Sequence, residues 1–471
     1  MVASSLPMHR TDSDRSAALR LLPPVDAILR LPALATLPRP LLARLAREWL
    51  DDLRANVLRG ALDATAVERA AATEALAAAI VERARRATER RHRRVFNATG
   101  VVLHTGIGRA PLCDAAVEAL AGAAGYAVVE VDPRSGERDQ RELGVAALLR
   151  AITGAGGALV VNNNAAATTL MLTALTAGRE VVVSRGELVE IGGGFRVPDV
   201  MRRAGCTMVE VGATNKTHLR DFTDATTPAT AAWLKVHPSN FRIEGFAGTP
   251  SVAELVASAA GRELLVLDDL GSGLFWNEPI AGLADEPRVQ QSLAAGATVT
   301  CVSGDKLMGG PQCGILLGDA ARIAACRAHP LYRALRCDKL TLAALEATLL
   351  VYRDGEPLRE IPTLRLLAAD PKELRARSEQ LAAALPGIGA VVVASESFAG
   401  SGANPARPLP SFAVALPGGD ALCDRLRAAR PVAVFARVAE GRVLLDARTL
   451  LLEDLAAVAA AVRAAVGAAS S

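Results

Sequence analysis

The sequence predicts a large, mostly parallel α/β domain that follows an N-terminal helical domain and precedes a small α+β domain. Three observations indicate this organisation. The chain has 471 residues, which is more than one ordinary hydrophobic core accommodates. Short β-branched runs alternate with helical stretches from residue 97 to about residue 318. A second group of strands and helices begins near residue 391.

We expect four parts in chain order. They are a helical domain over residues 1–75, a linker helix over residues 76–96, the large α/β domain over residues 97–335 and the small α+β domain over residues 336–471.

Two helices are expected in the N-terminal part. The first has apolar residues at helical spacing, namely Leu42, Leu45, Ala46, Trp49, Leu50, Leu53 and Val57. The second is rich in alanine and runs from about Thr65 to Arg91. Its end, residues 82–94, carries seven arginines against two glutamates, which fits either a solvated helix face or a patch that faces RNA.

Seven short apolar runs predict the strands of the large sheet. They are Ala158–Val161, Glu180–Ser184, Thr207–Val211, Ala232–Val236, Leu264–Leu267, Ala297–Val302 and Gly314–Leu317. Helices such as Ala165–Ala177 and Val252–Ala260 lie between them. The small domain has four expected strands and two expected helices, which are Val391–Ala394, Phe412–Leu416, Val432–Phe435, Val443–Leu445, Asp420–Ala429 and Leu451–Val466.

Composition argues against several classes of protein. The net charge is only +3, so a globally basic nucleic-acid binder is not indicated, and we expect no DNA partner. The seven cysteines form no CxxC pair and the six histidines form no ligand-spaced cluster, so we expect reduced thiols and no metal site. We find neither an apolar leader nor a run of about 18 uncharged apolar residues, which favours the cytoplasm over a membrane.

A lysine motif follows the strand that ends at Val302. Lys306 lies at this strand end, where α/β sheets bind ligands, and nearby glycines let the backbone approach a ligand closely. Lysine forms a Schiff base with an aldehyde cofactor when its pKa is low enough to supply a free amine. Ser303, three residues earlier, is a candidate for binding a phosphate. The alternative is a surface lysine beside a turn.

Two carboxylates follow another apolar strand in the segment LLVLDDLGSG, residues 264–273. A carboxylate beside a pyridine ring keeps the ring nitrogen protonated, which makes the ring an electron sink. Asp269 is the preferred candidate and Asp268 is the alternate. The competing explanation is a turn aspartate, which is common in an Asp-x-Gly sequence.

Three asparagines separate the strand that ends at Val161 from an alanine-rich helix. The free N–H groups and the dipole of a helix start form an anion site. Ordinary capping by asparagine is the alternative, although capping requires only one asparagine.

The chain order of these segments resembles that of aminotransferase-like pyridoxal-phosphate (PLP) enzymes of fold type I. Longer motifs resemble the bacterial selenocysteine synthases, the L-seryl-tRNA(Sec) selenium transferases. These motifs are LPPVDAIL, NATGVVLHTGIGRAPL, VVNNNAAATTLML, SRGELVEIGGGFRVPDVM, VGATNKTHLRDF, LKVHPSNFRIEGF, DLGSG, SGDKLMGGPQCG and GRVLLDARTL.

The resemblance implies roles around a bound PLP. Lys306 holds the cofactor and Asp269 pairs with its ring nitrogen. The implied phosphate ligands are Asn163, Asn164, Ala165 and Ser303. The residues implied to line the ring or its phenolic oxygen are His237, Ser239 and Asn240.

The resemblance also implies selenophosphate as a substrate, an anion that arginines bind. Arg109 matches one functional arginine of the family, and Arg333 and Arg336 match a further pair. At i, i+3 on a helix, this pair would share one face, which without the resemblance is more typical of a solvated surface. Asp305, beside Lys306, completes the expected catalytic set.

The implied reaction converts L-seryl-tRNA(Sec) to L-selenocysteinyl-tRNA(Sec) by loss of water and addition of selenium, with Lys306 as the general base. Residues 1–75 would bind the tRNA, and the family's assembly is a homodecamer, a pentamer of dimers. One alternative is a related lyase that acts on a free amino acid or amino sugar acid, although such relatives tend to lack the N-terminal helical domain. Another is a non-enzymatic regulator, but no helix-turn-helix signature precedes Asn97.

Overall fold

The computed structural model describes residues 12–192, 194–238, 240–241, 243–280, 282–400, 402 and 407–467. It divides into two compact units, with the boundary between Arg93 and Arg94. Among the described residues, no helix is both long and apolar enough to cross a membrane.

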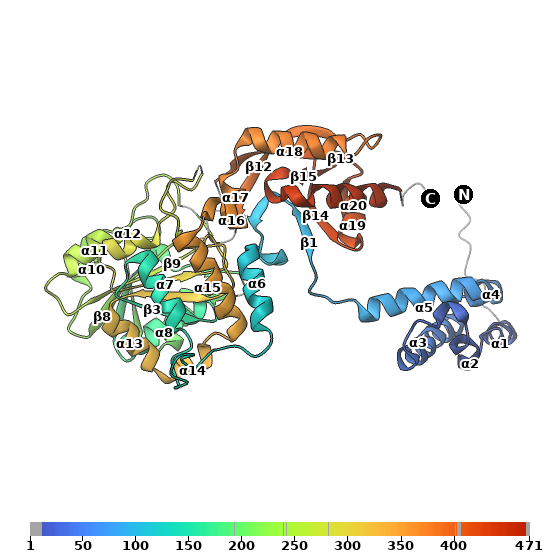
Figure 1. Ribbon diagram of the computed structural model, residues 1–471, viewed down its shortest axis with the longest axis horizontal. Coiled ribbons are helices and arrows are strands. Elements are labelled where there is room, and N and C mark those ends of the chain that lie inside the picture. The colour runs from blue at the N-terminus through green and yellow to red at the C-terminus, as the bar shows by residue number, and fades with distance from the viewer. Residues whose placement is uncertain are drawn as a thin grey trace, which may run out of the picture. The chain divides into compact units, whose positions relative to one another are not determined.

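The first unit is helical (Figure 1), with α1 (Asp12–Arg20), α2 (Val25–Leu29), α3 (Arg39–Leu58), α4 (Ala64–Ala71) and α5 (Thr73–Thr88). The predicted helix at α3 is confirmed, and all seven apolar residues that predicted it are buried. Its apolar face packs in one core with Leu76, Ala77 and Ile80 of α5. The part of the expected linker helix that lies in α5 therefore packs within this unit through Leu76, Ala77 and Ile80.

The prediction of one continuous helix from Thr65 to Arg91 is wrong. The helix α4 ends at Ala71, and Ala72 has φ −54° and ψ 135°, outside the helical region. α5 starts at Thr73 as a separate helix. A continuous alanine-rich pattern concealed this break, because alanine favours a helix at every position and gives no signal of its end.

The large sheet of the second unit has the strand order β3-β11-β10-β9-β8-β4-β7. Its strands are β3 (Gly157–Val161), β4 (Glu180–Ser184), β7 (Thr207–Val211), β8 (Thr230–Val236), β9 (Leu265–Gly271), β10 (Val299–Ser303) and β11 (Gly314–Gly318). All seven predicted strands are confirmed. Only β11 runs antiparallel to its neighbours, so the sheet is mostly parallel as expected.

Helices cover both faces of this sheet (Figure 1). Side chains of a strand alternate between the faces, and in β3 Leu159 and Val161 join one core while Ala158 and Val160 join another. The first core contains α8 (Asn164–Thr176), α9 (Val197–Arg203) and α13 (Ala320–Ala328). The second contains α7 (Leu143–Thr153), α12 (Val289–Ala294) and α15 (Lys339–Asp354). Burial on both faces explains why the strands read as continuous apolar runs.

Other short elements connect these layers. They are α6 (Asp114–Ala123), β5 (Glu190–Ile191), β6 (Phe195–Arg196), α10 (Leu219–Asp224), α11 (Val252–Ala259), α14 (Pro330–Leu335), α16 (Pro357–Glu360) and α17 (Pro362–Ala368).

The second sheet of this unit has the strand order β1-β14-β15-β13-β12-β2. Its strands are β1 (Val95–Ala98), β2 (Val101–Leu103), β12 (Val391–Gly400), β13 (Leu409–Pro417), β14 (Ala433–Ala439) and β15 (Arg442–Asp446). Its helices are α18 (Pro371–Ala383), α19 (Gly419–Ala428) and α20 (Leu455–Gly467). The four strands and two helices predicted for the small α+β domain are confirmed. The edge strands β1 and β2 come from the N-terminal side of the large sheet and were not predicted.

Candidate active site

A cavity of about 280 Å³ opens where the parallel strands β8, β9 and β10 end. Its lining residues are Arg109, Asn163, Asn164, Ala165, Val189, Ile191, Gly192, Phe195, Val236, His237, Asp269, Gly271, Ser303, Asp305, Lys306 and Gln312. The crevice at the carboxyl ends of the strands is where an open α/β sheet binds its ligand. The structure therefore brings the lysine, aspartate and asparagine segments of the sequence into one cavity.

Lys306 follows β10 and is only 6% exposed. Burial is the main cause that lowers the pKa of its amine, while the nearby charge of Asp269 acts in the opposite direction. Arg109 lowers the pKa further. A lowered pKa gives a larger fraction of free amine at neutral pH, which is the form that attacks a carbonyl.

The two adjacent carboxylates of β9 face different surroundings. Asp269 lines the cavity, and it accepts hydrogen bonds from Asn164 Nδ2 at 2.8 Å and from Thr168 Oγ1 at 2.9 Å. Asp268 is also buried but lies outside the lining, and it accepts from Ser292 Oγ at 2.5 Å. Burial raises the pKa of Asp269, whereas the hydrogen bonds from Asn164 and Thr168 lower it. Of the two candidates, only Asp269 is in place to meet a ligand.

The first turn of α8 also lines the cavity. Asn163 is the N-cap, and its Oδ1 accepts from the N–H of Ala166 at 2.9 Å. Asn164 and Ala165 line the cavity beside it. Gly314 allows this loop to pass closely, since a Cβ at that position would lie 2.1 Å from the carbonyl oxygen of Asn163. The helix start, with its dipole, fits an anion such as a phosphate.

Arg109 and Asp305 form an ion pair, with Nη1 2.7 Å from Oδ2, at the wall of the cavity. Arg109 has a φ of +62°, which is uncommon for a residue with a Cβ. Such backbone conformations persist where the surrounding structure fixes them, often at functional sites. The ion pair holds the Arg109 guanidinium beside Lys306 in the cavity.

His237 also lines the cavity, and its Nδ1 is buried with no hydrogen-bond partner in the described part of the chain. Burial, with the charges of Lys235 and Lys306, lowers the pKa of His237 to about 4. Its ring is therefore neutral near pH 7. Asn240 is outside the lining and donates from Nδ2 to the carbonyl oxygen of Glu190 at 2.7 Å. Ser239 lies outside the described residues.

Arg333 and Arg336 do not line this cavity. Arg333 is exposed on α14, and Arg336 lies just past the end of that helix, where it pairs with Glu130 at 3.3 Å. The expectation that both share one helix face is wrong, because the backbone of Arg336 is extended (φ −62°, ψ 145°). Its backbone instead bridges to Val161 at the end of β3.

Several residues of the site were not found by sequence reasoning. Thr168 donates to Asp269. It lies four residues after Asn164 on the same helix, and this spacing could have indicated that both side chains face the site. Gln312 and the β5–β6 hairpin residue Phe195 line the cavity. Gly402 approaches Lys306 so closely that a Cβ there would lie 2.6 Å from Nζ. This contact joins segments far apart in the chain, and the sequence carries no signal for it.

These residues fit a PLP molecule. The cavity offers a lysine amine of lowered pKa, a carboxylate for a ring nitrogen and a helix start for a phosphate. The buried Asn164 Oδ1 and His237 Nδ1 lack hydrogen-bond partners among the described residues, which is the state expected of groups that meet a polar ligand. No group of three or more His, Cys, Asp or Glu residues that could hold a metal ion occurs in the described ranges.

Comparison with solved structures relates the chain to a D-glucosaminate-6-phosphate ammonia-lyase. The TM-score is 0.58 at 23% identity, and the alignment covers 80% of this chain and 97% of the other. At this identity the likeness concerns the fold alone. The likeness agrees with the predicted aminotransferase-like fold of type I, and this prediction is confirmed.

Curated relatives match over nearly the whole chain. An L-seryl-tRNA(Sec) selenium transferase of Solidesulfovibrio magneticus is 48% identical over 458 residues, 93% of this chain and 96% of the relative. The proteins of that name from Nitratidesulfovibrio vulgaris and Moorella thermoacetica are each 45% identical, and they cover 95% and 92% of this chain. These alignments cover 99% and 94% of the two relatives. The family model described as L-seryl-tRNA selenium transferase matches residues 95–451. The chain thus belongs to the L-seryl-tRNA selenium transferase family.

Proposed function

We propose that this protein converts L-seryl-tRNA(Sec) to L-selenocysteinyl-tRNA(Sec), with selenophosphate as the selenium donor and PLP held at Lys306. The observation that carries the proposal is the meeting of Lys306 and Asp269 in one cavity beside the start of α8. Family membership and the match to relatives of that name over at least 92% of the chain support the substrate.

When bound, PLP supplies a protonated pyridine ring that draws electrons from the bonds of the substrate's Cα. Asp269 holds the proton at the ring nitrogen. Asn163, Asn164, Ala165 and Ser303 bind the phosphate. With PLP bound, Lys306, whose pKa is lowered by burial, would take the proton from Cα as a general base.

The arginines are proposed to bind the selenophosphate anion. Arg109 is already in the cavity, where Asp305 fixes its guanidinium. Arg333 and Arg336 lie outside the cavity of their own chain, so we propose that they act in the site of a neighbouring subunit. This requires an oligomer, and a homodecamer built as a pentamer of dimers is the proposed assembly. His237, Ser239 and Asn240 are proposed to lie near the cofactor ring and its phenolic oxygen.

The helical unit, which ends at Arg93, is proposed to bind the tRNA, and the unit that starts at Arg94 is proposed to hold the cofactor. The cytoplasm is the proposed location. The alternative substrate, a free amino acid or amino sugar acid, is less well supported, because the similar relatives extend over the helical unit as well.

The test combines turnover with cofactor attachment. Purified protein with PLP, seryl-tRNA(Sec) and selenophosphate should yield selenocysteinyl-tRNA(Sec). Lys306→Ala should yield none and should lose the visible absorbance of lysine-bound PLP and its reduction by borohydride. Lys372→Ala, at an exposed position of α18, is the matched control and should keep both. Turnover of a free amino acid without turnover of seryl-tRNA(Sec) would contradict the proposal.

A further inference from the structure

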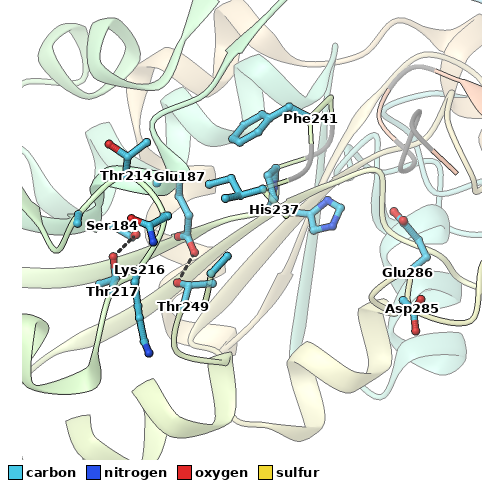
Figure 2. A pocket seen from close by; sticks show the side chains of 17 residues that line it. Ser184, Glu187, Thr214, Lys216, Thr217, His237, Phe241, Thr249, Asp285 and Glu286 are labelled. Atoms are coloured by element: carbon cyan, nitrogen blue, oxygen red, sulfur yellow. Dashed lines mark hydrogen bonds between the residues drawn. The ribbon is translucent and has the colours of Figure 1, made fainter. Parts of the chain in front are cut away.

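A second cavity, of about 380 Å³, lies beside the candidate active site, and His237 lines both. Its walls come from the ends of β4 and β8, from the loop after β7 and from the segment around Asp285 and Glu286 (Figure 2). A cavity of this size accommodates a small organic molecule. Because His237 lines both cavities, a ligand bound here lies next to the cavity that contains Lys306.

The floor of this cavity is built from polar groups that already have partners. Ser184 Oγ and Thr217 Oγ1 lie 2.8 Å apart, and Thr249 Oγ1 donates to Glu187 Oε1 at 2.7 Å (Figure 2). Lys235 also donates from Nζ to Glu187 Oε1, at 2.5 Å. These bonds fix the floor, so recognition depends on the groups along the rim.

The rim carries an aromatic ring and a cation. Phe241 lines the cavity and is 38% exposed, so one of its surfaces is left for a ligand. Lys216 also lines the cavity, and its Nζ lies 3.9 Å above the ring of Phe246. A planar base stacks on an exposed aromatic side chain. The Lys216 amine is held on Phe246, which does not line the cavity.

The opposite side of the cavity carries carboxyl groups. Asp285 and Glu286 lie there, apart from the Thr214 and Lys216 side, with His237 between the two sides (Figure 2). Glu286 is 5% exposed and accepts from Ser272 Oγ at 2.5 Å, which fixes its position. Carboxyl oxygens accept hydrogen bonds from sugar hydroxyls. The cavity therefore offers separate places for a base and a sugar.

We propose that this cavity binds the 3′-terminal nucleoside of the aminoacylated RNA, with the base on Phe241 and the ribose toward Glu286. The seryl group, esterified to that ribose, then passes His237 to reach Lys306. This assignment rests on the proposed function, because an aminoacyl-tRNA is the substrate that joins a reacting amino acid to a nucleoside.

Isothermal titration of the PLP-loaded protein tests the assignment. The two ligands are a stable amide, 3′-deoxy-3′-(L-serylamino)adenosine, and L-serine methyl ester, which has no nucleoside. The amide should bind more tightly than the methyl ester by about tenfold or more, the size of one base stacked on an aromatic ring. Phe241→Leu should weaken binding of the amide by about tenfold, and Phe241→Trp should retain it. The loss should be confined to the ligand that carries a nucleoside.

Tyr126→Leu is the matched control, because Tyr126 is a fully exposed aromatic residue outside this cavity. It should change neither dissociation constant. Equal affinities of the two ligands for the wild type, or an equal loss for both in Phe241→Leu, would overturn the assignment. The proposed function is tested separately, by measuring turnover of seryl-tRNA(Sec) with the same preparation. A protein that converts seryl-tRNA(Sec) without preferring the nucleoside ligand would refute the assignment alone.

Discussion

Asn164 and Asp269 are 105 residues apart in the chain, yet Asn164 Nδ2 donates to Asp269 Oδ1 over 2.8 Å. The bond ties the first turn of α8 to the end of β9. It therefore fixes the distance between the part of the site suited to a phosphate and the part suited to a ring nitrogen. It also favours the ionised form of Asp269, whose pKa is raised by burial.

The first prediction concerns this bond. Asn164→Ala removes a donor that lowers the pKa of Asp269, so that pKa rises further above its ordinary value. The ionised carboxylate is then lost at a higher pH as the solution is acidified. The acid limb of a plot of kcat/KM against pH should move to higher pH.

Two further variants complete this test. Thr168→Val removes the hydroxyl that also donates to Asp269 and should move the acid limb in the same direction. Asn163→Ala removes the N-cap bond to Ala166 but neither of these two donors to Asp269, so it should leave the position of the limb unchanged. An unshifted limb in both Asn164→Ala and Thr168→Val would show that Asp269 does not govern the acid side of the profile.

The second prediction separates the two carboxylates of β9. Asp269→Asn preserves the shape of the side chain but removes its negative charge from the cavity. Without that charge the ring nitrogen is not kept protonated, and kcat should fall by about 100-fold or more, the size of a lost electrostatic contact in an active site. Asp268→Asn is the control, because Asp268 contacts Ser292 outside the cavity. Equal losses in steady-state kinetics of both variants would contradict the assignment.

The fold was predictable because its strongest signals are local. Six of the seven strands of the large sheet are almost wholly buried, so each is a run of apolar residues that stands out from its surroundings, whereas the edge strand β7 exposes Thr207 and Glu210. The edge strands β1 and β2 are four and three residues long and pair with strands from the far end of the chain. A run this short has no measurable periodicity, and its pairing depends on tertiary structure.

The site was predictable where function follows from position at a strand end. Lys306, Asp269 and Asn163 each come at the end of an apolar strand, and parallel strands bring such positions together. No comparable rule predicts the contact between Gly402 and Lys306 from the sequence. The extended backbone of Arg336 was missed for a different reason, since helical spacing alone does not show where a short helix ends.

The third prediction tests the contact at Gly402. Its φ is +90°, and a Cβ there would lie 2.6 Å from Lys306 Nζ. Gly402→Ala should therefore displace the lysine, with loss of lysine-bound PLP and of turnover. The backbone strain alone should cost about 1 kcal/mol of unfolding free energy.

Gly387→Ala is the control for that strain. Gly387 has a φ of +75°, but a Cβ added there would meet no atom within 4 Å. The variant should show a similar loss in thermal unfolding and keep its absorbance of lysine-bound PLP. If Gly402→Ala binds PLP as well as Gly387→Ala does, the contact with Lys306 has no functional consequence.

The fourth prediction concerns the buried Glu286. Burial raises its pKa to about 7, while the hydrogen bond from Ser272 and the charge of Lys306 act against that rise. A raised pKa means that the folded state holds the proton more tightly than the unfolded state does. The stability that this provides is complete below the unfolded pKa of about 4.5 and is lost as the pH rises through about 7.

Glu286→Gln is neutral at every pH and does not lose this stability. The unfolding free energy of the variant minus that of the wild type should therefore increase from pH 4.5 to pH 8, by at most ~3 kcal/mol. Glu254→Gln should show the opposite trend, because the N–H and hydroxyl of Ser251 lower the pKa of Glu254. That carboxylate stabilises the fold above its unfolded pKa, so the Glu254→Gln variant should lose stability relative to the wild type as the pH rises. Denaturant unfolding from pH 4.5 to pH 8 measures the trend for Glu286→Gln, and unfolding below pH 4.5 measures that for Glu254→Gln, because the lowered pKa of Glu254 lies there. A flat difference for Glu286→Gln would show that Glu286 does not titrate with folding.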